Sequence, residues 1–316
     1  SLILRMPEIP RARLLYRYRR LEDARLAARA PGYRGAMFPW QSGSKGREET
    51  DARFYNPRSG RWMEDHSHVQ RHVGAAIAYN IWQYYEVTRD LEFLVDYGAE
   101  MLLDMARFWA SATTYDPALD RYGIHGVMGP DEYHDRYPGA DRPGLSNNAY
   151  TNVMAVWVLR RARAVLDLLP DAVGHRLRDR LGLTEEEIAE WETISRRMRL
   201  FFHADGILSQ FEGYEALREF DWEGYRQRYR DLYRLDFILE AEGDSTANYK
   251  LSKQPDVLML FYLFSSGELR ELFEHLGYPF DAQTIPRTID YYYRRSVHDS
   301  SLSRVADAWV LARAGR

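Results

Sequence analysis

Residues 91–112 read LEFLVDYGAEMLLDMARFWASA, and this stretch decides the class of the fold. Its large apolar side chains recur every three or four residues, as on one face of an α-helix. The same spacing predicts further helices over 10–30, 69–89, 147–169, 184–202, 213–219, 222–232, 252–266, 267–277, 284–290 and 303–314. Strand signals are few and short, at Ile207-Leu208 and Phe237-Ile238. The sequence therefore predicts an all-α protein.

The connections between the predicted helices are unequal in length. Segments 31–68, 113–146 and 233–251 are long and rich in Gly, Pro, Asp, His and Tyr. Long ordered loops on a helical scaffold usually carry function. No repeat of fixed length is visible, so we expect one all-α domain over residues 1–316 rather than a regular solenoid.

Composition excludes several classes of protein. The net charge of −4 gives no sign of a nucleic-acid partner or an anionic membrane surface. There is no Cys, so disulfides, thiolate metal sites and cysteine nucleophiles are excluded. No apolar run approaches the ~20 residues that span a bilayer, and cytoplasmic is the default expectation for location. Aromatic residues make up 14%, which suits the stacking of sugar rings but equally a helical core.

The loop at residues 126–134, GVMGPDEYH, carries two adjacent carboxylates, Asp131 and Glu132. Gly129-Pro130 is a strong turn signal, and the loop lies between two predicted helices. Carboxylates fixed on a short loop suit acid–base chemistry. A solvated acidic turn, or the cap of the next helix, has the same appearance.

Three other stretches supply candidate binding groups. Residues 33–50 contain Trp40 and Gln41 in a small, polar loop, which suits contact with a sugar, although Trp40 alone can equally anchor the loop to the core. Lys253 and Gln254 precede an apolar helix, where Ser252 or Asp256 can simply cap it. Hydroxyl groups at the start of a helix form an anion site or an ordinary cap, and such a run occurs at 296–303, SVHDSSLS.

Metal and triad interpretations are weaker. His68 and His72 are four residues apart, as two zinc ligands on one helix would be, but nothing else in the sequence converges on them. His298, Asp299 and Ser300 are immediate neighbours, and a hydrolytic triad needs groups brought together by the fold. We expect no metal.

Taken in order, these stretches resemble glycoside hydrolase family 65, the inverting phosphorylases of maltose, trehalose and kojibiose together with some hydrolases. The resemblance covers nearly the whole chain, and its matching segments are 35–40 (GAMFPW), His72, 76–79 (AIAY), 82–85 (WQYY), 129–133 (GPDEY), 147–152 (NNAYTN), 253–254 (KQ) and 298–303 (HDSSLS). The family implies an (α/α)6 barrel. This chain lacks a counterpart of the first barrel helices and of the family's N-terminal β-sandwich, so we interpret it as a fragment.

The resemblance also implies roles for individual residues. Glu132 is expected to be the general acid of an inverting phosphorolysis that releases β-glucose 1-phosphate. Trp40, Gln41, His72, Lys253 and Gln254 are expected to bind the glucosyl unit. His298, Ser300 and Ser301 are expected to bind inorganic phosphate, a co-substrate, and no cofactor is expected. The partners are a disaccharide and phosphate, with a homodimer as the possible assembly.

Two departures and two alternatives accompany this interpretation. Gln41 stands where the family usually has Glu, and an additional segment at 136–144 follows the carboxylates. The first alternative is hydrolysis of an α-glucoside, as in the family's trehalases. Against it, a glutamine at position 254 cannot act as a base toward water. The second alternative is a non-catalytic sugar-binding fragment, for which a retained proton donor would have no use.

Overall fold

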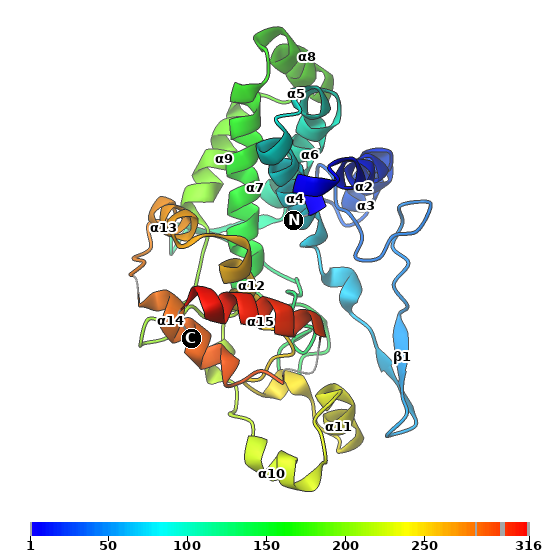
Figure 1. Cartoon of the computed structure of the whole chain (residues 1–316), viewed down its shortest axis with the longest axis vertical. Helices are drawn as coiled ribbons and strands as arrows, with labels where there is room; N and C mark the ends of the chain where they lie inside the picture. The colour runs from blue at the N-terminus through cyan, green and yellow to red at the C-terminus, as the bar shows by residue number, and fades with distance from the viewer. Residues whose placement is uncertain (1, 282, 298–300, 315–316) are drawn as a thin grey trace. The chain divides into compact units, whose positions relative to one another are not determined.

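The computed structural model describes residues 2–281, 283–297 and 301–314, and Figure 1 shows the helices that dominate it. The predicted all-α class is confirmed. Strands form only two short hairpins within these residues, β1 (Arg53–Asn56) with β2 (Arg61–Glu64) and β3 (Thr113–Asp116) with β4 (Arg121–Ile124). The described chain divides into two compact units, and the expected single domain over 1–316 stays a prediction.

Unit 1 comprises residues 1–50, 71–122 and 153–198. Its helices are α1 (Leu2–Arg5), α2 (Glu8–Tyr18), α3 (Leu21–Arg29), α4 (Val73–Thr88), α5 (Leu91–Phe93), the π-helical η2 (Leu94–Gly98), α6 (Ala99–Ser111), α8 (Asp171–Leu181), α9 (Glu185–Arg197) and most of α7 (Ala149–Leu168). The stretch at 91–112 is its centre, because Phe93, Met101 and Trp109 are completely buried. Helix α6 packs on α3, α4 and α9.

Unit 2 comprises residues 51–70, 123–152 and 199–316. After the β1–β2 hairpin it contains η1 (Ser67–Val69), η3 (Tyr214–Ala216), α10 (Trp222–Arg228), α11 (Leu235–Ala241), η4 (Thr246–Asn248), α12 (Asp256–Leu263), α13 (Ser266–His275), α14 (Thr284–Tyr293) and α15 (Ser301–Arg313). Helices α12, α14 and α15 pack on one another.

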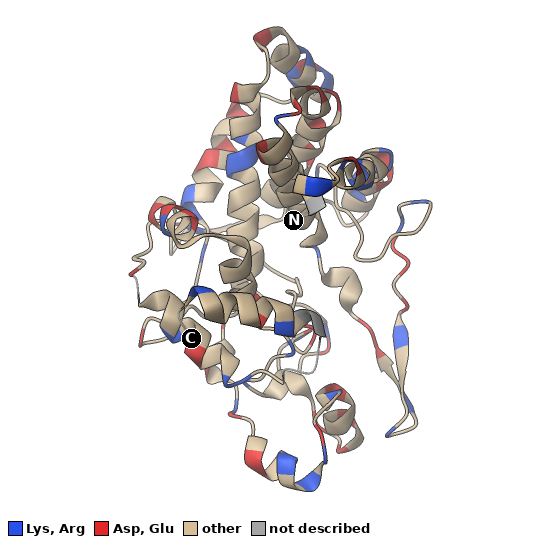
Figure 2. Ribbon diagram, in the orientation of Figure 1, with Lys and Arg blue, Asp and Glu red and all other residues tan. Residues whose placement is uncertain are grey.

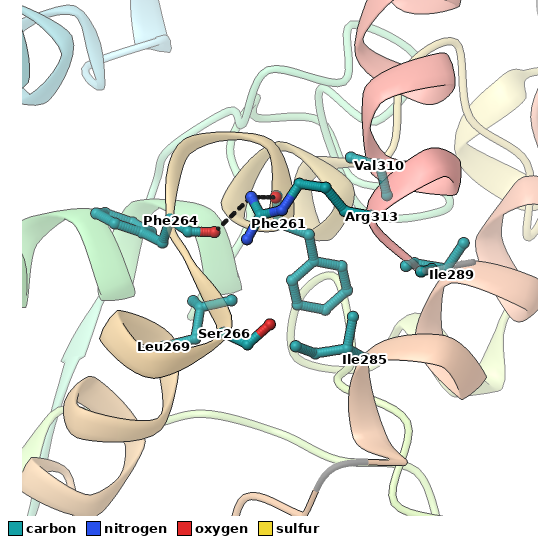
Figure 3. Close-up of a pocket in the computed structure, with 9 residues that line it drawn as sticks. Phe261, Phe264, Ser266, Leu269, Ile285, Ile289, Val310 and Arg313 are labelled. Carbon is teal, nitrogen blue, oxygen red and sulfur yellow. Dashed lines mark hydrogen bonds between the residues drawn. The ribbon is translucent and has the colours of Figure 1, made fainter. Parts of the chain in front are cut away.

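A small apolar cavity lies among α12, α13, α14 and α15, and Figure 3 shows Phe261, Ile285 and Ile289 pointing into it. Arg313 of α15 donates hydrogen bonds of 3.0 Å to the carbonyl oxygens of Phe261 and Phe264. These carbonyls lie at the end of α12, where a helix has no intrahelical partners for them. Arg313 therefore joins α12 and α15 while satisfying buried backbone groups.

Several predicted elements are wrong. The strand at Phe237-Ile238 lies inside α11, where the burial of Leu235, Ile238 and Leu239 against Tyr133 selects the helical period. The helix at 10–30 is two helices, which separate at Arg19–Arg20. Leu208 makes only an isolated bridge with Phe202. The two hairpins and α8 were not predicted from the sequence. Strand β1 has exposed or half-buried residues at three of its four positions, so its sequence shows little alternation of apolar and polar residues.

Acidic and basic residues are arranged differently on two helices of unit 1. Figure 2 shows them interspersed on α8, whereas on α9 acidic residues fill the first turn and basic residues the last. None of the helices in the described part of the chain is long and apolar enough to cross a membrane.

Candidate active site

The loop that joins β4 to α7 is closed at its base by backbone pairing. Val127 and Leu145 exchange hydrogen bonds of 3.2 and 2.7 Å, which defines a carboxylate loop over residues 126–145. The N–H of Met128 donates to the carbonyl of Val69 at 3.1 Å. These bonds fix both ends of the turn, so Gly129-Pro130 presents the following carboxylates from a defined backbone position.

Asp131 and His134 form a buried pair inside this loop. The Asp131 carboxylate accepts from Nδ1 of His134 at 3.0 Å, and both residues are 1% exposed. Nε2 of His134 lies 3.0 Å from the carbonyl oxygen of Tyr249, so both ring nitrogens face acceptors. An imidazole that donates from both nitrogens is an imidazolium. The pair is therefore a buried ion pair.

The pKa directions agree with this assignment. Burial by itself would raise the pKa of Asp131, but the hydrogen bond and charge of His134 outweigh it, and the net pKa is lowered. Burial by itself would lower the pKa of His134, but the hydrogen bond and charge of Asp131 outweigh it, and the net pKa is raised. Each member of the pair stabilises the charged form of the other.

A second buried carboxylate, Asp256, faces the same loop from the first residue of α12. Its oxygens accept from the backbone N–H of Asp131 and from Nδ2 of Asn148, both at 2.5 Å. Burial, followed by the nearby charge of Asp131, raises the pKa of Asp256 to about 8. Gly129 lies directly against this carboxylate, since a Cβ there would approach Oδ2 of Asp256 to 2.0 Å. Only glycine allows this approach.

Gln210 connects the two carboxylates. Its Nε2 donates to Asp131 at 2.9 Å, and its Oε1 accepts from the backbone N–H of Asp256 at 3.2 Å. Gln210 is completely buried. The side chains of Asp131, His134, Gln210 and Asp256, with Asn148, form a continuous hydrogen-bonded cluster, which we call the buried network.

Glu132 and Lys253 lie at the outer side of this network. Nζ of Lys253 donates to Oε2 of Glu132 at 2.5 Å, and their side chains are 25% and 40% exposed, respectively. The N–H of Lys253 donates to Asp131 at 3.0 Å, and Nε2 of Gln254 donates to the carbonyl of Pro130 at 2.8 Å. Three of the predicted site residues, Glu132, Lys253 and Gln254, are thus brought together in unit 2. Their chemical roles remain predictions.

The other predicted sugar-binding residues lie in unit 1. The backbone N–H groups of Trp40 and Gln41 donate to the carboxylate of Glu48 at 2.8 and 3.1 Å. The rings of Trp40 and His72 meet edge to face, with their centroids 5.6 Å apart. Trp40 is half-buried, Gln41 is exposed, and His72 is buried at the start of α4. The loop is therefore ordered by Glu48 around a Trp–His contact.

The predicted phosphate site cannot be placed, because His298 and Ser300 lie outside the described residues, as does the side chain of Ser301. Residues on both sides of this stretch form hydrogen bonds with residues 252–254. The N–H of Val297 donates to the carbonyl of Ser252 at 3.0 Å, and Oγ of Ser303 donates to Oε1 of Gln254 at 3.2 Å.

Among the residues that the structure describes, no group of three His, Cys, Asp or Glu side chains is arranged to hold a metal ion. Of the histidines weighed as metal ligands, His68 lies in η1 and His72 at the start of α4. Nδ1 of His66, which precedes η1, lies 2.6 Å from the carboxylate of Asp135. The triad weighed at 298–300 falls outside the described residues.

Sequence reasoning missed most of the buried network. The sequence presents Asp131 as one of two loop carboxylates suited to acid–base chemistry, and Asp256 as a helix cap, and it indicates no contact between them. The local signals that exist are the spacing of Asp131 and His134 and the glycine at 129. Asn148 lies in the matching segment 147–152, but nothing there indicates its bond to Asp256, 108 residues away. Gln210 carries no signal of its own, because its partners lie 46 and 79 residues away.

Comparison with known proteins gives consistent results. The model of the glycosyl hydrolase family 65 central catalytic domain matches residues 1–316. An uncharacterized glycosyl hydrolase of Mycobacterium tuberculosis is 56% identical over 315 residues, which are 100% of this chain and 24% of that protein. Trehalose 6-phosphate phosphorylase of Lactococcus lactis is 35% identical over 98% of this chain and 38% of its own length. Kojibiose phosphorylase of Halothermothrix orenii is 35% identical over 95% and 36%.

The fold is also found among solved structures. A putative kojibiose phosphorylase from the human microbiome superposes with a TM-score of 0.76, at 23% identity, over 96% of this chain and 39% of that one. This likeness is consistent with the expected (α/α)6 barrel. The chain spans about a quarter to two fifths of the length of these relatives.

Proposed function

The chain belongs to glycosyl hydrolase family 65, and from this premise we propose that it carries out inverting phosphorolysis of an α-glucosidic disaccharide. The products are β-glucose 1-phosphate and a free sugar. The observation that carries the proposal is the identity of its relatives. Proteins 32–35% identical to this chain are phosphorylases of trehalose 6-phosphate, kojibiose, 1,2-α-glucosylglycerol and α,α-trehalose.

Glu132 is the proposed general acid. In the reaction, the bond between C1 of the glucosyl unit and the glycosidic oxygen breaks while a phosphate oxygen bonds to C1 from the opposite face. The departing oxygen takes the proton of Glu132, and the transition state resembles an oxocarbenium ion. The partial exposure of Glu132 supports the role, because a group at 40% exposure is open to a substrate. Its position on a closed loop supports it further.

The remaining residues bind the two substrates. The family resemblance supports contact with the glucosyl unit for Lys253 and Gln254, and for Trp40, Gln41 and His72. It supports phosphate binding for the segment with His298, Ser300 and Ser301. A phosphorylase needs no second carboxylate as base, because phosphate is already an anion. An amide such as that of Gln254 cannot remove a proton from water, so this residue is compatible with a phosphorylase and not with the base of a hydrolase.

The test is product analysis with trehalose, maltose, kojibiose and nigerose, each with and without phosphate. Phosphate-dependent release of β-glucose 1-phosphate from any of them is the expected result. Sugar release independent of phosphate would instead identify an α-glucoside hydrolase. Binding of sugar without turnover by the full chain would identify a non-catalytic module, and either outcome would overturn the proposal.

A further inference from the structure

Two segments distant in sequence are joined by reciprocal hydrogen bonds behind the Glu132–Lys253 pair. The first is the carboxylate loop, and the second is residues 249–256, which we call the lysine segment. The carboxylate of Asp131 accepts the N–H of Lys253, and the carboxylate of Asp256 accepts the N–H of Asp131. Each segment thus supplies a side chain that binds the backbone of the other.

These reciprocal hydrogen bonds fix the backbone positions of Glu132 and Lys253. Asp131 directly precedes Glu132, so its N–H bond to Asp256 fixes the backbone from which Glu132 projects. The same carboxylate fixes the backbone of Lys253. His134 balances the charge of Asp131 and bonds to Tyr249, the first residue of the lysine segment. The bonds of Asp131 to Asp256 and to His134 are buried, and those of Asp131 to Lys253 and of His134 to Tyr249 are partly buried, whereas the Glu132–Lys253 pair is open to solvent.

We infer that Asp131, His134 and Asp256 are positioning residues for the proton donor, acting through Glu132 and Lys253 without contacting the substrate. This inference rests on the proposed function. Proton transfer to a departing oxygen depends steeply on geometry, and a displacement of about 1 Å costs on the order of 100-fold in rate. Exposed side chains have no close packing to hold them. The buried network supplies the rigidity through the backbone instead.

The experiment compares two substrates that differ in their need for a proton. A disaccharide that yields glucose 1-phosphate requires protonation of its leaving oxygen, whereas α-glucosyl fluoride releases a stable anion and does not. The variants are Asp256→Asn, which loses one of two acceptor oxygens, and Gly129→Ala, which displaces Asp256 without changing any charge. Both are measured in the full chain with saturating phosphate.

For each variant we expect kcat on the disaccharide to fall by roughly 10- to 100-fold, and kcat on the fluoride to change by less than about threefold. Asp104→Asn is the matched control, because Asp104 is a buried carboxylate of unit 1, 2% exposed, and is not bonded to either segment. It is expected to lower thermal stability while leaving the ratio of the two rates unchanged.

The outcomes separate this inference from the proposed function. If Asp256→Asn and Gly129→Ala lower both rates equally, or neither, the positioning role is wrong. Glu132→Gln is run in parallel: if it retains turnover of the disaccharide, the general acid itself is wrong. A variant that fails to fold is detected by its melting curve. Gln210→Met, which removes the bonds to Asp131 and to the N–H of Asp256 without adding a charge, then takes its place with the same expected ratio.

Discussion

Two buried clusters keep carboxylates out of water by different means. In unit 1, Arg25 donates to Asp104 at 2.8 Å and to Glu100 at 2.7 Å, and Arg180 donates to Glu100 at 2.9 Å. In the buried network of unit 2, Asp131 pairs with the imidazolium of His134, and backbone N–H groups and amides supply the other donors to Asp131 and Asp256.

The difference indicates what each cluster does. The unit 1 cluster joins side chains of helices α3, α6 and α8, so it fixes how helices pack. Burial would lower the pKa of Arg25, but its carboxylate partners outweigh this and raise it, and the burial of Asp104 raises the pKa of that carboxyl. The unit 2 network bonds to loop backbone, so it fixes where loops lie. A cluster that bonds one helix to another is structural, and a cluster that bonds to loop backbone orients a site.

The largest expected effect tests whether Glu132 is the proton donor that the network positions. Glu132→Gln removes the proton donor, and general acid catalysis contributes about 10²- to 10⁴-fold. We expect disaccharide phosphorolysis to fall by that factor while turnover of α-glucosyl fluoride persists. Glu132 is partly exposed, so the free energy of unfolding should stay within about 0.5 kcal/mol of wild type. Near wild-type turnover of the disaccharide would contradict the assignment.

The next prediction removes the cation from each cluster. His134→Leu leaves the carboxylate of Asp131 buried and unpaired, which costs about 3–5 kcal/mol of unfolding free energy. Arg25→Met leaves Asp104 unpaired and is expected to cost about the same. Urea unfolding measures both. Only His134→Leu should change the ratio of disaccharide to fluoride turnover, and an equal change in both variants would erase the distinction between the clusters.

The pH dependence of stability follows from the shifted pKa values of the network. The raised pKa of His134 contributes stability that is complete below 6.5 and is lost as the pH rises through the folded-state value. Asp256 behaves in the same sense: with its pKa raised from 3.8 to about 8, the folded protein keeps a proton that the unfolded chain has released, so stability falls between these values.

Both groups therefore predict a lower free energy of unfolding at alkaline pH. We expect a fall on the order of 2 kcal/mol between about pH 6 and about pH 9. The lowered pKa of Asp131 acts at the opposite end, since its contribution is lost only as the pH falls below 3.8. Urea unfolding at several pH values measures the trend. Asp256→Asn should flatten it, and a slope that is unchanged in this variant would remove Asp256 from the explanation.

The sequence predicts these two clusters unequally well. Helical spacing identified the stretch at 91–112 that carries Glu100 and Asp104, because periodicity is a local signal. The family resemblance predicts that Glu132, Lys253 and Gln254 belong to one site, and the structure places them close together, while their roles stay predictions. Asp256 resembled a helix cap because capping is recognised within four residues, but its oxygens bond instead to residues 108 and 125 positions away. Such contacts exist only after folding, so no local pattern contains them.

The smallest expected effect measures how much one uncharged acceptor of a backbone N–H contributes to the free energy of unfolding. Oγ of Ser265 accepts from the N–H of Glu268 at 3.2 Å, and the carboxylate of Glu268 accepts from the N–H of Ser265 at 2.8 Å, so the two form a capping box at the start of α13. Ser265→Ala should cost about 1 kcal/mol of unfolding free energy, and Glu268→Gln, which keeps its acceptor, should cost less. Neither should alter the ratio of the two turnover rates.

The hydroxyl of Ser265 in this exposed cap accepts a backbone N–H as the carboxylate of Asp131 does, but without burial or charge of its own. If Ser265→Ala lowers the free energy of unfolding as much as His134→Leu does, then burial of the charged pair adds nothing to the stability that the network provides. The network would then stabilise the fold no more than an exposed helix cap does. The expected gap of about 2–4 kcal/mol between the two variants is the penalty for stranding a buried charge. That penalty makes the network intolerant of displacement, which is the property that a backbone anchor for a proton donor requires.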